Sequence, residues 1–495
     1  MAATAAAAVL VHLACGNAYG VLRDELYFLA CGRHPAFGYV DQPPVVPLLA
    51  RLAAAVFGPT PMGLRIPAYL AHAGTVWATA LLAGRLGGGP RARLLAAAMA
   101  LVAPGLLGGA HLLTMSSVEP LLWTGVLLGV LRAVDGDRRG GWLLAGACVG
   151  FGLLTKYSMV FWVTALLAGL LATEARRALA SGWLLAAVAV AAVLALPNFF
   201  WQAAHGFPML ELLGRMSQKN VQLGPGSFLL EVLKGANPFV AWVWGAGLVW
   251  LLVDRLPGRR WLGLAVVAVV AAFLALHAKP YFLYPALPAV YAAGGCVWER
   301  SLSSPGRLAA RLVYLGVSGA AMALLTLPLL SPPAFAALQA RIGAGAAPDE
   351  KLSLAAPLPN FLADQLGWPE LVLSIADAHR ALPPALRARA AVIAPDYGVA
   401  AAIDLYGPPL GLPRATAGHN NYWLWGPPPD DARAVLLVGP GPRDAAGDLC
   451  GRLVQVGETP DSRWNMPYER RVPIYLCTEI TRPFRTSWAR FRYVY

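Results

Sequence analysis

The sequence predicts a bundle of membrane-spanning helices followed by a small α/β domain. Of its 495 residues, 58% are hydrophobic and only 13% are charged, whereas a soluble chain carries about a quarter charged residues. Uncharged stretches of roughly 16 to 22 residues recur about eleven times, and each is long enough to cross a bilayer as a helix. After Pro328 charged residues return at ordinary density. These observations indicate a polytopic membrane protein with a C-terminal domain in water.

The apolar stretches predict about eleven transmembrane helices. No signal-peptide cleavage pattern follows the first stretch, so we expect it to remain as a helix. The predicted spans lie near residues 4–22, 63–84, 94–110, 112–131, 142–157, 159–173, 182–200, 236–253, 261–276, 281–298 and 308–330.

Clustered arginines predict the orientation of this bundle. Lys and Arg favour cytoplasmic loops, and eleven crossings then place the N-terminus in the cytoplasm and the C-terminal part on the other side of the membrane. The same topology signal explains the net charge of +13 without a nucleic-acid partner. The basic loops contain Arg85, Arg91 and Arg93; Arg132, Arg138 and Arg139; Arg176 and Arg177; Arg255, Arg259 and Arg260; and Arg300, Arg307 and Arg311.

The C-terminal part alternates strand-like and helix-like segments. Residues 390–394, 434–439 and 473–477 are short apolar runs, and residues 370–382 have a helical pattern. This alternation predicts an α/β domain with a sheet, so we divide the chain into a membrane domain, 1–330, and an extracytoplasmic domain, 331–495. Outside the cytoplasm Cys450 and Cys477 could pair, although the sequence does not fix their distance.

The first predicted external loop, residues 23–62, concentrates acids. It begins with Arg23, Asp24 and Glu25, and Asp41 stands before two prolines that stiffen the backbone and remove amide donors. The apolar stretches beside these acids are typical of short amphipathic helices at a membrane interface. The alternative is a solvated collar of charge, but the rigid Asp41 segment favours acids held against the membrane surface.

Other polar side chains fall on the same predicted face. Glu119 lies inside a span, which indicates a functional site or a carboxylate paired with a neighbouring helix. Lys156 suits an anionic ligand such as a lipid phosphate, or simply reaches the interface. His205 is an interface anchor or a metal or proton-handling residue, and Lys279 stands at the outer mouth. Cations suit a phosphate leaving group, and carboxylates suit a general base or a divalent ion.

Several segments resemble one enzyme family over about residues 15–330. They are "RDELYFLACGRHPAFGYVDQPPVVPLLARL", "SSVEPLLW", "LLTKYS" and "KPYFLYPALPA". They resemble the bacterial family 39 glycosyltransferases, which are integral-membrane, polyprenyl-phosphate-sugar-dependent enzymes of the GT-C class, related to protein O-mannosyltransferases and the aminoarabinose transferase acting on lipid A. Tail segments including "GHNNYWLWGP" and "MPYERRVPIYLC" resemble the extracytoplasmic domain of a bacterial subgroup.

The resemblance implies roles for individual residues. The family's catalytic acid and its acidic partner fall on Asp24 and Glu25, and its acid-proline at a helix start falls on Glu119. A divalent metal ion is implied near Asp41, with His205 as the matching histidine. The chain departs from the pattern at Glu119, where related enzymes often have Asp, and at Gln42, which replaces a lysine and leaves the donor sugar open. Substrate binding is expected at Lys156, Tyr157, Lys279, Tyr281, Arg33 and Gln42.

The implied function is transfer of a sugar from a polyprenyl-phosphate donor to a hydroxyl of a lipid, polysaccharide or protein acceptor, with inversion at the anomeric carbon. The main alternative is a lipid or solute transporter or flippase with an external binding domain, which would also carry acids and lysines in its spans. A third is a scaffold whose tail binds glycan. The segment 418–427 suits stacking on sugar rings or a turn packed onto the membrane domain.

Overall fold

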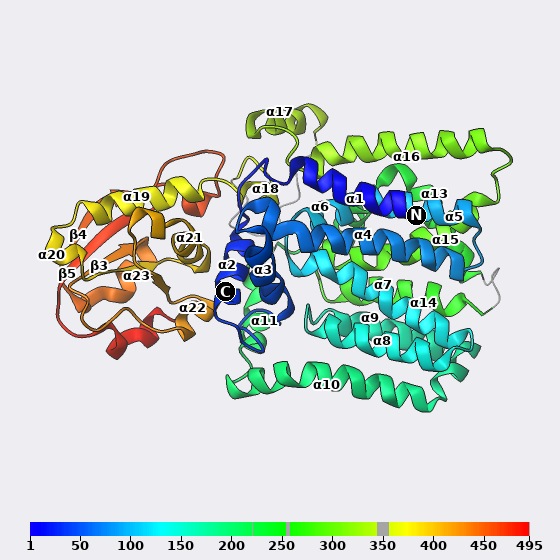
Figure 1. The fold of residues 1–495 in the computed structure, drawn as a ribbon, viewed down its shortest axis with the longest axis horizontal. Coiled ribbons are helices and arrows are strands. Elements are labelled where there is room, and N and C mark those ends of the chain that lie inside the picture. Colours follow the sequence, from blue (N-terminus) through cyan, green and yellow to red (C-terminus); the bar gives the residue numbers. More distant parts are fainter. Residues whose placement is uncertain (220, 254–257, 344–355, 495) are drawn as a thin grey trace.

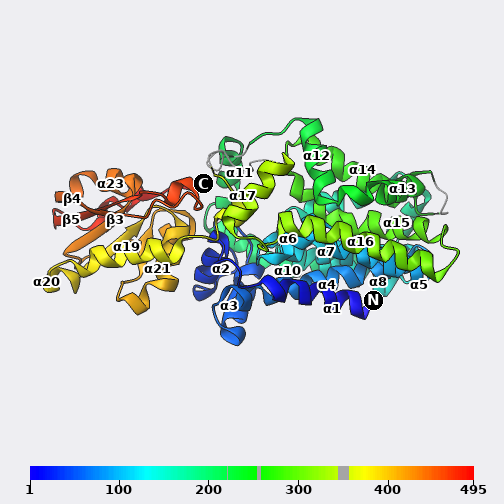
Figure 2. The ribbon, with the colours of Figure 1, turned by 90° about the horizontal axis from the view of Figure 1, so that it is seen from above.

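The computed structural model describes residues 1–219, 221–253, 258–343 and 356–494. Long helices run side by side in one part of the molecule, and a smaller part built on a sheet lies at one end of them (Figure 1). A view turned by 90° shows α2 (Arg23–Arg33) and α3 (Val45–Phe57) at that end of the bundle, next to the sheet domain (Figure 2). The segment 23–62, predicted as the first external loop, therefore lies between the two parts.

Every predicted span overlaps a helix, although the first, expected at 4–22, ends at Cys15 and is followed by non-helical residues. The span expected at 94–110 is broken between α5 and α6, where Pro104 begins a new helix, because proline cannot supply the amide donor that would continue α5. The helices are α1 (Ala2–Cys15), α4 (Pro61–Arg85), α5 (Pro90–Leu101), α6 (Pro104–His111), α7 (Met115–Val134), α8 (Arg138–Leu153), α9 (Met159–Leu171), α10 (Gly182–Ala204), α13 (Ala241–Leu252), α14 (Arg260–Ala275), α15 (Leu287–Glu299) and α16 (Pro305–Thr326).

Only some of these helices could cross a membrane alone. Within the described residues, α4, α7, α10 and α16 are long and apolar enough, and two bent pairs raise the number to six. The pairs are α5 with α6, bent by 56°, and α12 (Pro225–Gly235) with the segment Pro238–Leu252, bent by 90°. Shorter apolar helices, including α1, α9 and α14, lie beside them. The eleven crossings stay a prediction.

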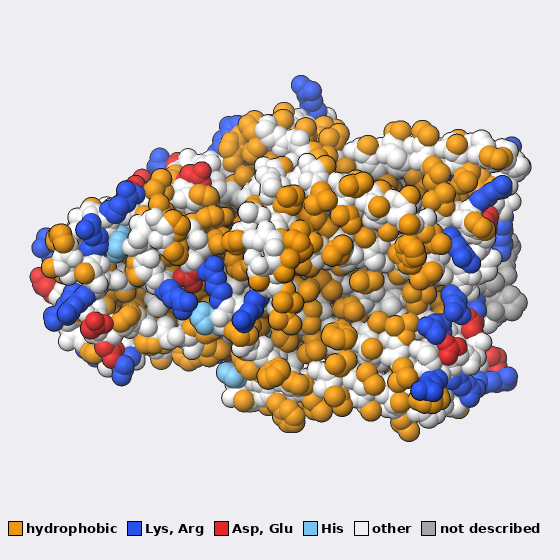
Figure 3. Space-filling model, viewed as in Figure 1, with side chains coloured by type: hydrophobic (Ala, Val, Ile, Leu, Met, Phe, Trp, Pro, Cys, Tyr) orange, Lys and Arg blue, Asp and Glu red, His pale blue; other side chains and the backbone are white. Residues whose placement is uncertain are grey.

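Three of the Arg-rich turns meet at one end of the bundle. Asp135, in the turn after α7, pairs with Arg259 at 2.5 Å and with Arg85 at 3.9 Å. Lys and Arg side chains gather at the end away from the sheet domain, and a largely apolar surface separates that end from the domain (Figure 3). The basic turns therefore lie at one end of the bundle, as the sequence predicted. That this end faces the cytoplasm stays a prediction.

The C-terminal sheet has five strands in the order β2-β1-β3-β5-β4. The three predicted strands are confirmed as β1 (Ala390–Ala394), β3 (Ala434–Val438) and β5 (Pro473–Ile480). β1 pairs in parallel with β3 and with β2 (Ala415–Ala417), and β5 is antiparallel to β3 and to β4 (Cys450–Glu458). Cys450 and Cys477 form a disulfide between β4 and β5.

Short helices surround this sheet and its approach. The predicted helix at 370–382 is α19 (Trp368–Arg380). The predicted domain division at residue 330 stays a prediction, since α16 ends at Thr326 and further helices precede β1. The remaining helices are α11 (Pro208–Lys219), α17 (Pro332–Ile342), α18 (Asn360–Ala363), α20 (Pro384–Arg387), α21 (Tyr397–Tyr406), α22 (Asn420–Leu424) and α23 (Pro440–Ala446), with 3-10 segments that include η3 (Pro280–Ala286).

One hydrophobic core joins the two parts. Leu26, Tyr27 and Leu29 of α2 are buried together with Val399 and Ala400 of α21. Helix α2 is thus packed as much into the C-terminal domain as onto the membrane bundle. Burial of these apolar side chains fixes α2, and with it the acids at its first turn.

Candidate functional site

The first turn of α2 presents its two acids in different directions. Successive residues of a helix lie about 100° apart around its axis. The side chain of Glu25 is fully buried, whereas that of Asp24 is 45% exposed. The turn itself is closed by a 2.8 Å hydrogen bond from the Leu22 amide to Glu25 Oε2. The adjacent acids, predicted as a catalytic pair, therefore lie in very different surroundings.

Glu25 is paired with an arginine that the sequence analysis did not single out. Arg65 of α4 is also fully buried and donates from Nε and Nη2 to the two Glu25 oxygens, each at 2.9 Å. The Leu113 amide donates to Glu25 Oε1 at 2.7 Å. Arg65 donates further to the Gly16 and Gly20 carbonyls. The pair joins α2, α4 and the segment before α7, which suits a framework role.

Asp24 is held from the C-terminal domain. The Tyr397 hydroxyl donates to Asp24 Oδ1 at 2.8 Å, and Arg23 Nε lies 4.0 Å from the same oxygen. Among the described residues no hydrogen bond is made to the other oxygen, Oδ2. Asp24 is thus a partly exposed carboxylate with one oxygen held and the other available to a substrate.

Asp41 lies in the same interface. The Tyr27 hydroxyl donates to Asp41 Oδ1 at 3.1 Å, and the Asn420 side-chain amide donates to Oδ2 at 3.0 Å. Burial raises the pKa of the Asp41 carboxyl to about 7, although both hydrogen bonds act in the opposite direction. The backbone before it is fixed by Asn421, whose Oδ1 accepts from the Val40 amide at 2.7 Å. The segment 418–427, which was predicted to stack on sugar rings or to pack as a turn onto the membrane domain, contains α22 and contacts the first loop through Asn420 and Asn421.

The predicted phosphate-binding lysine is paired with the predicted intramembrane acid. Lys156 Nζ lies 3.1 Å from Glu119 Oε2 and donates to Ser116 Oγ at 3.2 Å, while the Ser158 hydroxyl donates to the other Glu119 oxygen. Glu119 is thus the carboxylate paired with a neighbouring segment that the sequence left open. The pair does not exclude phosphate binding, because Lys156 retains donor capacity.

Aromatic rings surround the two predicted lysines. Lys156 Nζ lies 4.1 Å from the centre of the Phe282 ring and 5.1 Å from that of Tyr281. Lys279 Nζ lies 5.9 Å from the same Tyr281 ring. Tyr281 therefore contacts both cations, as a cation–π partner does, and the two lysines lie at one end of the bundle.

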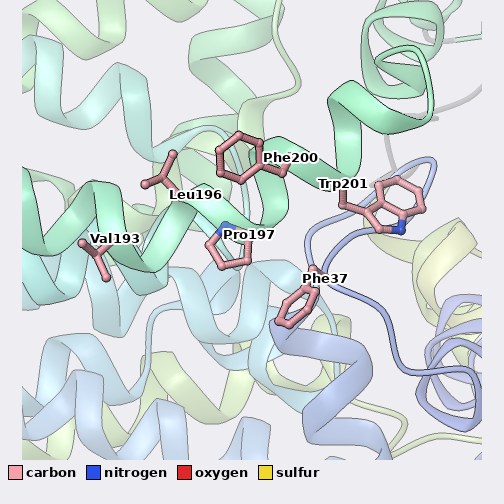
Figure 4. Close-up of a pocket in the computed structure, with 6 residues that line it drawn as sticks. All are labelled: Phe37, Val193, Leu196, Pro197, Phe200 and Trp201. Carbon is pink, nitrogen blue, oxygen red and sulfur yellow. The ribbon is translucent and has the colours of Figure 1, made fainter.

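Tyr157 connects the first loop to α10 beside an apolar groove. Its hydroxyl donates to Asn198 Oδ1 at 2.7 Å, and the Asn198 amide donates to the Phe37 carbonyl at 2.9 Å. The groove, about 580 Å³, opens on the surface beside these contacts (Figure 4). Such a lining accommodates hydrocarbon rather than a sugar. It consists of Phe37, Val193, Leu196, Pro197, Phe200 and Trp201.

Three predicted site residues have other surroundings. Arg33 donates to the Asp404 carbonyl of the C-terminal domain at 2.9 Å. Gln42 is buried, and its side-chain amide points at Cys31 Sγ, 3.7 Å away. His205 is exposed, with its ring stacked on Trp201 at 4.0 Å and Nδ1 2.8 Å from the Trp201 carbonyl oxygen. His205 therefore has the contacts of an interface anchor.

The side chains around Asp41 do not make a ligand set for a metal ion. Both Asp41 oxygens accept hydrogen bonds from neutral donors. In the part of the chain that the structure describes, no group of three or more His, Cys, Asp or Glu side chains is placed to hold one. A divalent ion at Asp41 and His205 stays a prediction, and no step proposed below goes through a metal.

Contacts across the bundle end bring the remaining candidates into one region. Glu25 binds the Leu113 amide, two residues before α7 begins, and α7 carries Ser116 and Glu119. The Val45 amide at the start of α3 donates to the Leu154 carbonyl at 3.1 Å, just before Lys156. The sequence did not single out Arg65, Tyr397 or Asn198 for the site. Arg65 could have been recognised from the sequence, because it is a lone arginine inside the apolar span predicted at 63–84.

A bundle of apolar helices therefore carries acids and lysines at the end that the small sheet domain covers. Residues 41–201 match the family model of dolichyl-phosphate-mannose-protein mannosyltransferases. The chain is 30% identical over 158 residues to undecaprenyl phosphate-alpha-4-amino-4-deoxy-L-arabinose arabinosyl transferase 1 of Pseudomonas fluorescens (strain Pf0-1). This match covers 30% of the chain and 28% of the relative.

Solved structures extend the similarity in fold to nearly the whole chain. ArnT from Cupriavidus metallidurans in the apo state superposes with a TM-score of 0.63 at 17% identity, covering 95% of this chain and 97% of that one. ArnT bound to undecaprenyl phosphate gives a TM-score of 0.61 at 16% identity with the same coverage. The predicted GT-C fold and the family resemblance are confirmed, and the transporter alternative is not favoured.

Proposed function

We propose that this protein is a membrane glycosyltransferase that moves a sugar from a polyprenyl-phosphate donor to an acceptor hydroxyl. The sequence relative and the family model are both named as sugar transferases, and one structure of the same fold was solved with undecaprenyl phosphate. Asp24 carries the proposal within this chain. It is a partly exposed carboxylate between the two domains, with one oxygen held by Tyr397.

Asp24 acts as the general base in the proposed reaction. Its second oxygen takes the proton of the acceptor hydroxyl as that oxygen forms a bond to the anomeric carbon. The bond from this carbon to the phosphate oxygen breaks, and its electron pair leaves with the polyprenyl phosphate. A base placed on the face opposite the leaving group gives inversion. Glu25 does not share this role in the proposal, because its contacts close the first turn of α2 at Leu22 and hold α2 to Arg65 and Leu113.

Lys156 and Lys279 stabilise the departing phosphate. Cationic groups aimed at developing negative charge are the largest single contribution in many transfer reactions. Glu119 and Ser116 hold the Lys156 ammonium in place before donor binds, and the Tyr281 ring contacts both lysines. Glu119 is thus assigned a supporting task. Tyr157 fixes the loop beside the donor through Asn198.

The lipid chain of the donor is accommodated outside the bundle. The groove between Phe37 and α10 is apolar and borders the Tyr157–Asn198 contact. A prenyl chain bound there would lie on the outside of the helix bundle, in contact with lipid. The proposal places the reaction at the outer face of the cytoplasmic membrane, with the C-terminal domain outside. The acceptor is a hydroxyl of a lipid, polysaccharide or protein.

The test is transfer by purified protein from a panel of polyprenyl-phosphate sugars, followed as release of polyprenyl phosphate. A positioned general base contributes about 10² to 10⁴ in rate, so Asp24→Asn should lower kcat by at least about 10²-fold without changing thermal stability. Asp431→Asn, on an exposed turn of the C-terminal domain, is the matched control. Full activity of Asp24→Asn would overturn the assigned mechanism, and an inactive wild type on every donor would overturn the function.

A further inference from the structure

The C-terminal domain reaches both acids of the first loop that face it. Tyr397 donates to Asp24, and Asn420 donates to Asp41. Tyr397 begins α21 and Asn420 begins α22, so the two donors are 23 residues apart in the C-terminal domain. The two acids that they contact belong to the first loop of the membrane domain. The C-terminal domain thus directs one hydrogen bond at each of the two acids, from two separate elements.

Tyr397 is built as a rigid donor. It is the first residue of α21, whose start is capped by Asp396 through bonds from the Gly398 and Val399 amides. Its ring stacks on Tyr27 of α2 at 4.5 Å, and the Arg23 guanidinium lies 5.4 Å from the ring centre. Burial raises the pKa of the Tyr397 hydroxyl, so it keeps its proton and donates.

Asn420 is held in a conformation that few residues adopt. Its φ is +46°, in the left-handed region that asparagine tolerates better than most side chains. In that conformation its amide reaches Asp41, and the next residue, Asn421, binds the Val40 amide. Two consecutive asparagines therefore fix both the carboxylate and the backbone that carries it.

We propose that Tyr397 and Asn420 are positioning residues for the transfer reaction, so that the C-terminal domain completes the active site by orienting Asp24 and Asp41. The inference rests on the proposed function and adds to it a task for the C-terminal domain. The domain thereby acts on the chemical step, whereas an acceptor-binding module would act on acceptor affinity alone.

Tyr397→Phe removes only the hydroxyl and keeps the stacked ring. Loss of this charge-assisted hydrogen bond should lower kcat about tenfold or more, with little change in the KM for donor or acceptor. Tyr406→Phe, at the other end of α21, is the matched control, because no hydrogen bond of its hydroxyl is found among the described residues. A rise in acceptor KM with kcat unchanged would overturn the inference.

Hydrogen exchange tests the positioning without any activity. Asn420→Gly removes the amide but accepts the left-handed backbone at no steric cost, so the domain should still fold, which a thermal melt checks. Exchange across residues 36–44 should rise at least several-fold in this variant. Unchanged exchange and unchanged kcat would together overturn the inference even with an active wild type. If the wild type transfers no sugar, the function fails, and exchange alone decides whether the domain orders the loop.

Discussion

Glu25 and Arg65 form a buried ion pair whose loss should destabilise the whole bundle end. Glu25→Gln keeps the shape of the side chain and removes its charge. The fully buried Arg65 then lacks a counter-charge, and a single amide oxygen replaces two carboxylate oxygens that accept from Arg65, Leu22 and Leu113. Removing one partner of such a pair costs about 3–5 kcal/mol.

The assay is thermal unfolding of the purified protein in detergent, followed by tryptophan fluorescence. For a chain of this size a loss of about 3 kcal/mol should lower Tm by roughly 3 °C. Glu174→Gln is the matched control, because Glu174 pairs with Arg177 at an exposed site and such pairs contribute at most about 1 kcal/mol. An equal Tm for Glu25→Gln and Glu174→Gln would refute the reasoning.

A double variant separates the charge pair from the framework it holds. Glu25→Leu with Arg65→Leu removes both charges, which is often neutral when only a pair is lost. Here it also strands the Leu22 and Leu113 amides and the Gly16 and Gly20 carbonyls, each at about 1–3 kcal/mol if it stays buried. The double variant should therefore remain less stable than wild type. A double variant as stable as wild type would show that the stranded amides and carbonyls cost nothing, and would refute this reasoning.

Orientation, the disulfide and one buried acid can each be measured directly. A cysteine at Gln222 should react with an impermeant maleimide from outside and one at Arg138 should not; outside labelling of position 138 would reverse the topology. Cys450→Ser opens a link across 27 residues and should cost about 3.5 kcal/mol on the chain-entropy model, so an unchanged melt of the C-terminal domain would contradict it. The Glu469 carboxyl is 1% exposed, neither oxygen has a hydrogen-bond partner among the described residues, and burial raises its pKa. Its contribution to stability is complete below the ordinary glutamate pKa and is lost as pH rises through the raised value, so Glu469→Gln should gain stability over wild type with increasing pH. A gain independent of pH would contradict this assignment.

The sequence by itself determined where the apolar helices and three of the five described strands lie. Apolar length and strand composition are properties of a few consecutive residues, and they predicted the span at 182–200 and the strand at 390–394, which the structure has as α10 and β1. Local chemistry also indicated that Asp24, Asp41 and Lys156 were unusual, because charge beside or within an apolar span is costly. The helix break at Pro104 is also encoded locally, by the proline itself. It was not predicted, because the residues on both sides of it form one continuous apolar run.

Only the tertiary structure decided what these residues contact. Asp24 and Glu25 are neighbours in the chain, yet one faces Tyr397, 373 residues away, and the other faces Arg65, 40 residues away. Which side of α2 meets which domain depends on apolar packing between α2, α4 and α21, and no local pattern encodes that choice. Hydrogen bonds then form wherever packing brings a donor to a buried acceptor. The partners of the acids are therefore a consequence of the assembled core.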